Sequence, residues 1–390
     1  MKKKILIHTL FYQNYNYGGI LQAYALYSKL SSLGYDCEEL NYDRNVTGKI
    51  KKIIYRGYRL WEIIREPIYY KKSKQRAAIQ NCDRNRYISE YNDELRKVFE
   101  AFMTSEFKTT KVFHPDNFNK IHGYDYYIAG GDQVWNPDWT DKNFFFYKLR
   151  DGKKIGYSCS AGKNKFTSSD KRKIVKYAKK MDAITVRENN FSKMLLDSNI
   201  SNRVIADPVF LLNKSEWIDF SNDKYDLPEH YLFAYLLGDD VQRREAIKKF
   251  AKLNNLKIVS IPHVFRYYIE EDEQFADIKI RDAGPKEFVA LIRNADFVVT
   301  DSFHGTAFSI IFEKQFLNFS RFKADDKRSL NARLKNINEE YGLMERMVNI
   351  NDLETVQINS LNKIDYNECR KTTEKKRTDA LTFIDEALRL

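Results

Sequence analysis

Long apolar runs, disulfide-forming cysteines and the features of a signal peptide are all missing from this sequence of 390 residues. No stretch approaches the ~20 uninterrupted apolar residues that a membrane-spanning helix needs. The basic first four residues are followed by His8 and Asn14 rather than by an apolar segment, which argues against secretion. The four cysteines have no CxxC spacing and favour reduced thiols in the cytosol; they are Cys37, Cys82, Cys159 and Cys369. We therefore expect a cytoplasmic protein.

Motifs of several common enzyme classes are also missing. There is no HExxH or DxD metal motif, and the six histidines are dispersed along the chain. No GxGxxG follows the first predicted strand, and neither a Walker lysine motif nor a GxSxG elbow occurs. We therefore expect no bound metal and no cofactor, and we set aside nucleotide hydrolysis and serine-hydrolase chemistry.

Positive charge is abundant but unevenly spread. The formal net charge is +12, and the segment from Arg44 to Arg86 holds 13 of the 66 lysines and arginines but only 3 of the 54 acidic residues. Residues 48–72 mix these cations with Ile, Tyr and Trp61, a pattern typical of helices that lie on anionic membranes. The alternative is a helical hairpin that packs its apolar side on the protein and leaves its basic side solvated.

The partners follow from this charge. The membrane hypothesis places residues 48–76 on the inner leaflet of the plasma membrane, with the protein peripheral on that face, and the packed hairpin stays open as the alternative. We expect no nucleic acid, because no nucleic-acid-binding module accompanies the charge.

Alternating strands and helices predict two α/β domains, and the length and the 43% hydrophobic content suit two cores. In the first half, short apolar runs predict parallel strands at 4–9, 35–41, 124–129, 153–157 and 183–186. Helices are predicted from Gly18 to about Leu33 and over 168–180. In the second half, strands starting at 231, 257, 296 and 315 alternate with helices at 241–254, 286–293 and 304–312. A last helix is predicted at about 375–390.

These patterns predict two Rossmann-like domains that face each other across a cleft. We place the first at 1–212, with a basic helical insertion at about 44–105. A linker at 213–230 leads to the second domain at 231–350, and a helical tail covers 351–390. Because ligands bind at the carboxyl ends of the strands in such sheets, candidate site residues are sought where strands end.

The most informative strand end is A-D-F-V-V-T-D-S-F-H-G-T-A-F-S-I-I-F, residues 295–312. A buried strand runs into Asp301, Ser302 and His304, and an apolar helix follows at once. Free amides in the first turn of that helix, at Gly305 and Thr306, predict a site for a phosphate or carboxylate, with His304 as a proton donor. The alternative is an Asp or Ser N-cap followed by a core histidine.

A second strand end is I-A-G-G-D-Q-V-W-N-P, residues 128–137. Glycine lets a ligand approach the backbone, and an aromatic ring beside amides and a carboxylate suits a sugar. The alternative is a tight turn whose tryptophan fills the domain. The candidates are Gly131, Asp132, Gln133, Trp135 and Asn136.

A third strand end, D-A-I-T-V-R-E at 182–188, stops on Arg187, whose guanidinium group can clamp a carboxylate or phosphate. The alternative is a surface ion pair, for example with Glu188. Two further glycine-bearing strand ends are individually weak, N-Y-N-Y-G-G and Y-S-C-S-A-G. They add the candidates Gly18, Gly19, Ser158 and Ser160.

Five motifs in order resemble the polysaccharide pyruvyl transferase family: N-Y-G-G-I-L-Q-A-Y-A-L, A-G-G-D-Q-V-W-N, V-R-E-N-N, A-D-P-V-F-L-L and A-D-F-V-V-T-D-S-F-H-G-T-A-F-S-I. The resemblance extends from about residue 5 to residue 346. It implies a GT-B-like fold of two Rossmann-like domains. It also implies the transfer of a pyruvyl group from phosphoenolpyruvate to two sugar hydroxyls as a cyclic ketal, with release of phosphate.

The resemblance implies roles for two residues and exposes one departure. His304 matches the family histidine assigned to acid catalysis and donor binding, and Arg187 matches the arginine of the V-R-E segment, which contacts the donor. Where many members read R-L-H or R-x-H, this chain reads S-F-H, so Ser302 stands where a phosphate-binding arginine is expected. The basic segment after the next strand offers three candidate replacements, Lys323, Arg328 and Arg333.

Two carboxylates complete the expected site. We assign Asp132 as the proton acceptor on the acceptor side and Asp301 as the group that orients His304. The expected protein is thus a pyruvyltransferase that modifies a lipid-linked precursor of a capsule or exopolysaccharide. The alternatives are a metal-independent GT-B-like glycosyltransferase that uses a nucleotide sugar, and a non-catalytic glycan-binding member of the family.

Overall fold

The structure is a computed structural model that describes residues 2–45, 84–138, 140–163, 165–238, 240–262, 269–320, 331–349, 353, 356–358 and 361–389. The basic core of the predicted insertion, including the membrane-contact segment 48–76, lies outside the described residues. So do two of the predicted donor-binding residues, Lys323 and Arg328.

The first half of the chain forms a six-stranded parallel sheet in the order β2-β1-β3-β4-β5-β6. Its central strands are apolar and buried on both sides, as in sheets covered by helices on both faces. The strands are β1 (Lys4–His8), β2 (Asp36–Glu39), β3 (Tyr126–Gly130), β4 (Lys153–Cys159), β5 (Ala183–Val186) and β6 (Arg203–Val204). All five strands predicted in this half are present.

Three helices cover this sheet. α1 (Tyr17–Ser32) follows β1, and the Asn16 side chain caps it by accepting from the Gly19 amide at 3.1 Å. α5 (Ser168–Ala178) begins with a reciprocal capping box between Thr167 and Asp170. α6 (Asn189–Leu196) follows β5 directly. Each connection crosses between parallel strands, so the carboxyl ends of β1, β3, β4 and β5 share one edge.

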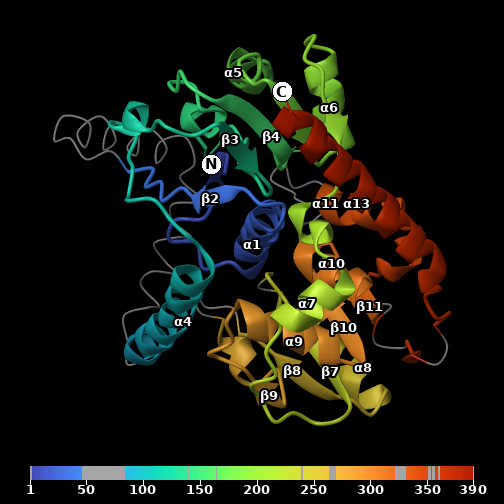
Figure 1. The fold of residues 1–390 in the computed structure, drawn as a ribbon. Coiled ribbons are helices and arrows are strands. Elements are labelled where there is room, and N and C mark those ends of the chain that lie inside the picture. The colour runs from blue at the N-terminus through green and yellow to red at the C-terminus, as the bar shows by residue number, and fades with distance from the viewer. Residues whose placement is uncertain are drawn as a thin grey trace.

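The second half forms a five-stranded parallel sheet in the order β11-β10-β7-β8-β9. The strands are β7 (Tyr231–Tyr235), β8 (Lys257–Ser260), β9 (Ile278–Lys279), β10 (Phe297–Thr300) and β11 (Gln315–Asn318). They alternate with α8 (Val241–Leu253), α9 (Pro285–Asn294) and α10 (Phe303–Ile311), and α11 (Asn331–Glu340) follows β11. The two sheets lie in separate lobes, with α1 and α10 between them (Figure 1). This confirms the predicted pair of Rossmann-like α/β domains.

Two helices that the predictions placed in the insertion and the linker pack between the lobes. α4 (Arg84–Glu106) ends the predicted insertion, and its Phe99 shares one hydrophobic cluster with Tyr17 of α1 and Phe288 of α9. α7 (Lys214–Phe220) lies at the start of the predicted linker, and its Trp217 is fully buried. Both helices therefore belong to the shared core rather than to a solvated connection.

The last helix, α13 (Tyr366–Arg389), starts nine residues before the predicted one and joins the two lobes. Its first turns pack beside the second domain through Tyr366 and Cys369. Its last turns place Phe383 and Leu388 against Ile5 and Ile7 of β1. Figure 1 shows the helix running along one side of the molecule from the lower lobe to the upper one.

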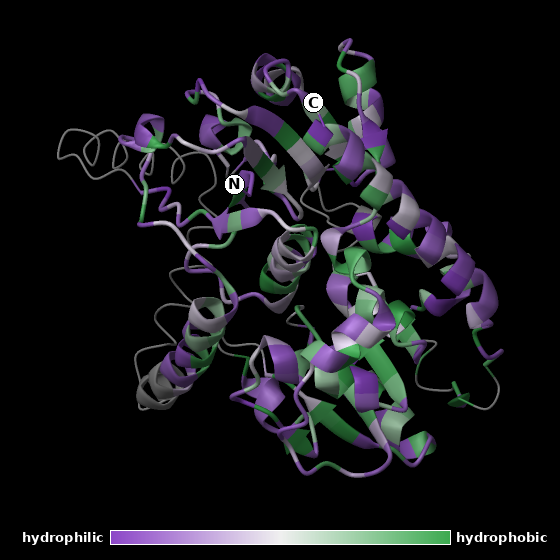
Figure 2. Ribbon diagram, in the orientation of Figure 1, coloured by the Kyte–Doolittle hydropathy of each residue, from purple (hydrophilic) through white to green (hydrophobic). Residues whose placement is uncertain are grey.

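The hydropathy pattern follows this packing. Apolar residues fill the strands and inward helix faces, whereas the outer surfaces of α13 and α5 are hydrophilic (Figure 2). Within the described part of the chain, no helix combines the length and the apolar character needed to cross a membrane.

Candidate active site between the two domains

His304 sits at the point where the two domains touch. It lies in the first turn of α10, directly after β10, and its residue surface is 6% exposed. Its ring faces the backbone of Gly18 in the first turn of α1: a Cβ atom added to Gly18 would lie 2.0 Å from His304 Nδ1. Only glycine leaves room for this contact, so the imidazole of one domain rests on the helix N-terminus of the other.

A buried carboxylate, Asp207, faces the other side of the His304 ring. Asp207 Oδ2 lies 3.7 Å from His304 Nε2 and 2.5 Å from Arg187 Nη1, and its side chain is 0% exposed. Its second oxygen accepts from the Val209 amide at 3.1 Å, which fixes the carboxylate at the start of the 3₁₀ turn Pro208–Leu211. Burial by itself would raise the pKa of Asp207, but His304 and Arg187 hold that pKa well below its usual value.

Arg187, at the end of β5, is surrounded by acidic groups. Besides Asp207, its guanidinium nitrogens lie 3.5 Å from Asp132 Oδ1 and 3.6 Å from Glu188 Oε1. The Phe303 ring packs 4.8 Å from the guanidinium carbon. Arg187 Nε and Nη2 are buried and have no hydrogen-bond partner among the described residues. Nε faces Glu188 and Nη2 faces Asp132 at ion-pair distance, so these two buried donors become available to an anion only when it displaces a carboxylate.

Arg333 of α11 brings a second guanidinium group from the second domain. Its Nη1 lies 3.0 Å from Asp132 Oδ1. Gln133 lies beside it, and with its amide oxygen turned toward the arginine it accepts from Arg333 Nη2 at 3.1 Å. One oxygen of Asp132 therefore joins arginines from both domains.

A cavity of about 30 Å³ opens beside this cluster. It has room for about two water molecules, so a larger ligand must move part of the wall. Its charged lining includes Arg187, Asp207 and Arg333, and further along Glu340 and Lys376, which pair at 3.0 Å. The lining is built from both domains and from α13, as a site between two lobes requires.

The electrostatic balance of this cluster is unusual for an anion site. Three carboxylates, Asp132, Glu188 and Asp207, lie within 3.6 Å of the Arg187 guanidinium group, which leaves Arg333 as the second cation. The arginines are thus neutralised by the protein itself. A phosphate or carboxylate ligand gains full contact with them only where it displaces a protein carboxylate.

The structure brings several of the predicted residues together. His304, Arg187, Asp132, Gln133 and Arg333 converge on one place, with Gly18 against the histidine. Gly131, with φ +61°, lies beside them, and a Cβ atom there would lie 1.4 Å from the Gln22 side chain. This glycine lets α1 approach the end of β3.

The predicted role of Asp301 needs correction. Its carboxylate accepts from the backbone amides of Leu237 at 2.7 Å and Gly238 at 2.9 Å, so it fixes the loop after β7. The carboxylate that faces His304 is Asp207. Asp301 and Asp207 are both buried carboxylates at strand ends. The backbone amides of the loop after β7 hold Asp301, the one that we predicted.

The predicted anion-binding amides of α10 also need correction. Ser302 is the N-cap of this helix: its Oγ accepts from the Gly305 amide at 3.4 Å, and its carbonyl accepts from the Thr306 amide at 3.0 Å. Thr306 Oγ1 donates to the same carbonyl. The first-turn donors are therefore satisfied within the helix, as the N-cap alternative predicts.

Trp135 is not a sugar platform. It is 0% exposed, its Nε1 donates to the Phe144 carbonyl at 3.1 Å, and it stacks on Phe145. The alternative, a tryptophan that fills the domain, is correct. Asn136 is likewise buried, and its side-chain oxygen accepts from the Asp138 amide at 3.0 Å.

The weaker candidates have structural contacts. Ser160 donates to Glu188 and accepts from the Gly162 amide, so it supports the carboxylate beside Arg187. Ser158 is buried with φ +47°, and its amide donates to Thr185 at 2.8 Å. Gly19 faces the Asn14 side chain, with no room for a Cβ atom between them.

Sequence reasoning missed Asp207 as a site residue. It follows the short strand β6 and precedes Pro208 in A-D-P-V-F-L-L, so it too stands at a strand end. A carboxylate at a strand end, within the motif A-D-P-V-F-L-L, could therefore have been predicted as a site residue. β6 has only two residues, too short for the apolar run by which the other strands were found.

Comparisons with known proteins agree with this architecture. A family model described as polysaccharide pyruvyl transferase matches residues 16–321. The UDP-GlcNAc 2-epimerase of Methanocaldococcus jannaschii has a similar structure, with 13% identity and a TM-score of 0.50, covering 98% of this chain and 100% of that one. A trehalose-6-phosphate synthase, OtsA, has 9% identity and a TM-score of 0.52, covering 100% and 99%. Sequence comparison with curated proteins gives no match. The fold is of the GT-B type.

The contact of His304 with Gly18 generates the first prediction. Gly18→Ala should favour α1 by itself, but its methyl group collides with the His304 ring. We expect a loss of about 1–3 kcal/mol in the free energy of unfolding, as for overpacked interiors. Thermal or urea unfolding measures it.

The control is a double-mutant cycle with His304→Ala. Once the ring is removed, Gly18→Ala should cost little or become stabilising. An equal loss of stability in both backgrounds would show that the ring does not rest on Gly18.

Proposed function

Because the chain belongs to the polysaccharide pyruvyl transferase family, we propose that it moves a pyruvyl group from phosphoenolpyruvate to two hydroxyls of one sugar. The product is a cyclic ketal on a polysaccharide precursor, and phosphate is released. The observation that carries this proposal is the buried contact of His304 with Asp207, beside the buried guanidinium group of Arg187. It offers a proton donor next to an anion site.

Phosphoenolpyruvate carries a carboxylate and a phosphate, and the two arginines of the cluster suit these groups. Arg187 offers Nε and Nη2 from the first domain, and Arg333 adds a guanidinium group from the second. Guanidinium groups bind both kinds of oxyanion in bidentate geometry. We propose that Arg333 supplies the charge missing at Ser302. Lys323 and Arg328, outside the described residues, stay predicted donor ligands.

The chemistry requires one acid and two departing hydroxyl protons. We propose that His304 protonates C3 of the donor, which turns the vinyl carbon C2 into an electrophile. The first sugar hydroxyl adds to C2 and loses its proton. The C2–O bond to phosphate then breaks, and the second hydroxyl closes the ketal at C2 as its proton leaves. Asp207, 3.7 Å from Nε2, acts as the positioning residue of His304.

Asp132, expected as the acceptor-side base, has a different place in this proposal. Its Oδ1 is shared by Arg187 and Arg333, and it occupies the position between them that a donor oxyanion needs. We propose that the donor displaces Asp132 from the arginines. The freed carboxylate is then available to the acceptor hydroxyl.

The acceptor belongs to polysaccharide synthesis, as the family implies. We propose that it is a lipid-linked glycan precursor. The predicted membrane contact through 48–76 lies outside the described residues and stays a prediction. No cofactor enters the proposed reaction, and phosphoenolpyruvate is a substrate.

The reaction itself is tested with purified protein, phosphoenolpyruvate and a glycan acceptor, by measuring phosphate release. We expect release that depends on the acceptor and falls by roughly 10²-fold or more in His304→Ala, because a general acid contributes at least that much. The matched control is His230→Ala, since the His230 side chain is 70% exposed.

Turnover of a nucleotide sugar but not of phosphoenolpyruvate would instead support the glycosyltransferase alternative. Binding of the glycan without turnover of either donor would indicate a non-catalytic member.

The role of Asp207 is tested by Asp207→Asn, which keeps the shape and one acceptor oxygen but removes the charge. We expect kcat to fall by roughly 10²-fold, since the ring that donates the proton loses the carboxylate that positions it.

The matched control is Asp296→Asn, which alters a surface Asp–His pair with His230 at 3.3 Å. A kcat that Asp207→Asn leaves unchanged would reduce Asp207 to a purely structural group.

The displacement of Asp132 is tested by Asp132→Asn and binding calorimetry with phosphoenolpyruvate. Removing the competing carboxylate should lower the dissociation constant by about 10-fold, the equivalent of ~1.4 kcal/mol. Asp138→Asn, on the same loop with a 66% exposed side chain, is the control. Unchanged affinity with a reduced kcat would return Asp132 to the role of acceptor base alone.

A further inference from the structure

A second concentration of positive charge lies within the described part of the first domain. Between Lys142 and Lys180 the sequence holds 13 lysines and arginines but only two acidic residues, Asp151 and Asp170. Both acids are engaged by the fold: Asp151 accepts from the Gly123 amide at 2.7 Å, and Asp170 closes the capping box of α5. With 13 cations against these two carboxylates, the segment keeps a formal excess of +11.

Most of these cations are exposed. They stand on α5 and on the segments before β4 and α5: Lys142, Lys148, Arg150, Lys153, Lys165, Lys171, Arg172, Lys173, Lys176, Lys179 and Lys180. Among the described residues, the one carboxylate within 4 Å of any of them is Asp182, which lies 3.9 Å from Lys153. The remaining charges are thus available to an outside partner.

The geometry of α5 sorts these side chains onto one face. Ile174 and Ala178 point inward and are buried, so Arg172, Lys176 and the lysines of the last turn lie on the opposite side of the helix. We call the outward set the α5 basic face; it consists of Lys142, Tyr147, Arg172, Lys173, Lys176, Tyr177, Lys179 and Lys180.

Two half-buried tyrosines border this face. The rings of Tyr147 and Tyr177 meet edge to face at 5.0 Å. Lys180 lies 4.6 Å and Lys142 5.1 Å from the Tyr147 ring centre, and Lys176 lies 5.5 Å from that of Tyr177. These cation–π contacts hold the ammonium groups close to the tyrosine rings and leave N–H donors available to a partner.

We propose that the α5 basic face docks the protein on an anionic lipid bilayer. Each lysine or arginine near such a surface adds its own electrostatic attraction. The six cations of this face can therefore bind a bilayer without a specific pocket. Tyrosine suits the same boundary because its ring is apolar and its hydroxyl is polar. The face is the outside of a helix, and neither described cavity is lined by it, so a plane fits it better than a single extended strand.

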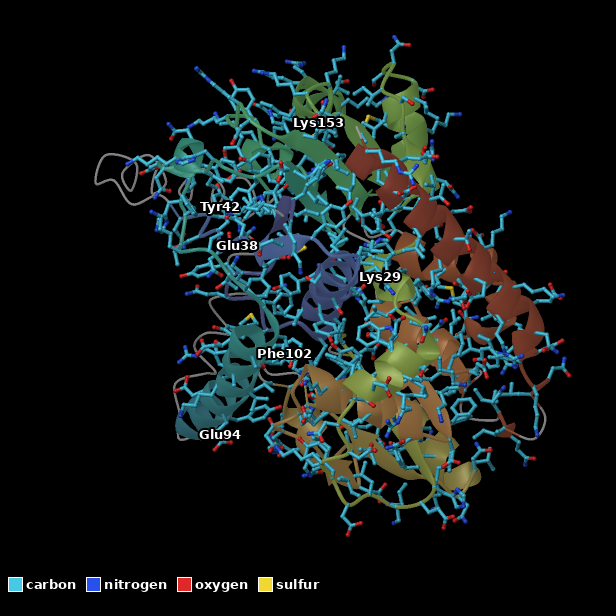
Figure 3. All side chains as sticks on the ribbon, in the orientation of Figure 1. Lys29, Glu38, Tyr42, Glu94, Phe102 and Lys153 are labelled. Atoms are coloured by element: carbon cyan, nitrogen blue, oxygen red, sulfur yellow. The ribbon has the colours of Figure 1, made fainter. Side chains whose placement is uncertain are left out.

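The position of the face suits docking. α5 lies on the outer side of the first domain, in the lobe away from β7–β11 (Figure 1). Side chains there project freely into solvent, with Lys153 labelled at the same end of the molecule (Figure 3). A bilayer on this side leaves the second domain free. The proposal is separate from the contact predicted for residues 48–76 and does not depend on the reaction.

The character of the face also sets the kind of binding. The exposed large apolar side chains of the described residues, such as Leu33, Leu196 and Met344, do not belong to it. Binding should therefore be electrostatic and fall as salt rises, because the charges are screened over about a Debye length.

The test is co-sedimentation of the full chain with vesicles of two parts phosphatidylcholine to one part phosphatidylglycerol. We expect binding at low salt, its loss at high salt, and none to phosphatidylcholine alone. The variant R172Q/K176Q/K179Q/K180Q should bind roughly 100-fold more weakly or worse, since four surface charges are removed. Circular dichroism checks its fold.

The control variant K97Q/K252Q/K371Q/K375Q makes the same change in charge at exposed positions elsewhere. It should keep most of the binding. Equal vesicle binding by the α5 variant and the wild-type protein would overturn the proposal. Tighter binding of a short nucleic-acid duplex than of the vesicles would also overturn the proposal. The α5 basic face would then be a nucleic-acid-binding surface.

Discussion

The site depends on one buried carboxylate that is shared between two domains. Asp207 belongs to the first domain and reaches His304 of the second, while its other contacts, Arg187 and the Val209 amide, lie on its own side. Burying a charge is costly unless it is paired and hydrogen-bonded. Arg187 and the Val209 amide satisfy this charge within the first domain, and the observed arrangement of the lobes adds His304 at 3.7 Å. Chemistry and domain geometry are coupled through this group.

Two further features hold that contact in place. Gly18 lets the His304 ring lie against α1, where any side chain would force the lobes apart. Arg377 of α13 donates to the carbonyl groups of Phe210 at 3.1 Å and Leu212 at 3.3 Å, at the end of the turn that Asp207 begins. Because α13 packs on both lobes, it braces the loop of Asp207 and the relative position of the domains together.

Much of this architecture could be predicted from the sequence, because each strand is a short apolar run and each strand end in a parallel sheet points to one edge. That reasoning placed His304 and Arg187 correctly at the edge. It failed where a local hydrogen bond competes with ligand binding. Ser302 caps α10 and accepts from the amides that we expected to bind an anion. It failed for Trp135 because only the packed loop shows which way the ring turns. Asp207 depends on a two-residue strand that leaves almost no pattern.

The proposed replacement of the arginine expected at Ser302 by Arg333 rests on the charges of the site. In the structure, Arg333 reaches Asp132 across the gap at 3.0 Å, so a guanidinium group from α11 is already present beside Arg187. With Asp132 between them, the arginines need no ligand to avoid mutual repulsion, and the cavity beside them stays small. An incoming oxyanion then replaces a like charge rather than filling an empty cationic pocket. Binding becomes an exchange of one carboxylate for another anion, which favours ligands that offer two anionic groups at once over those that offer one.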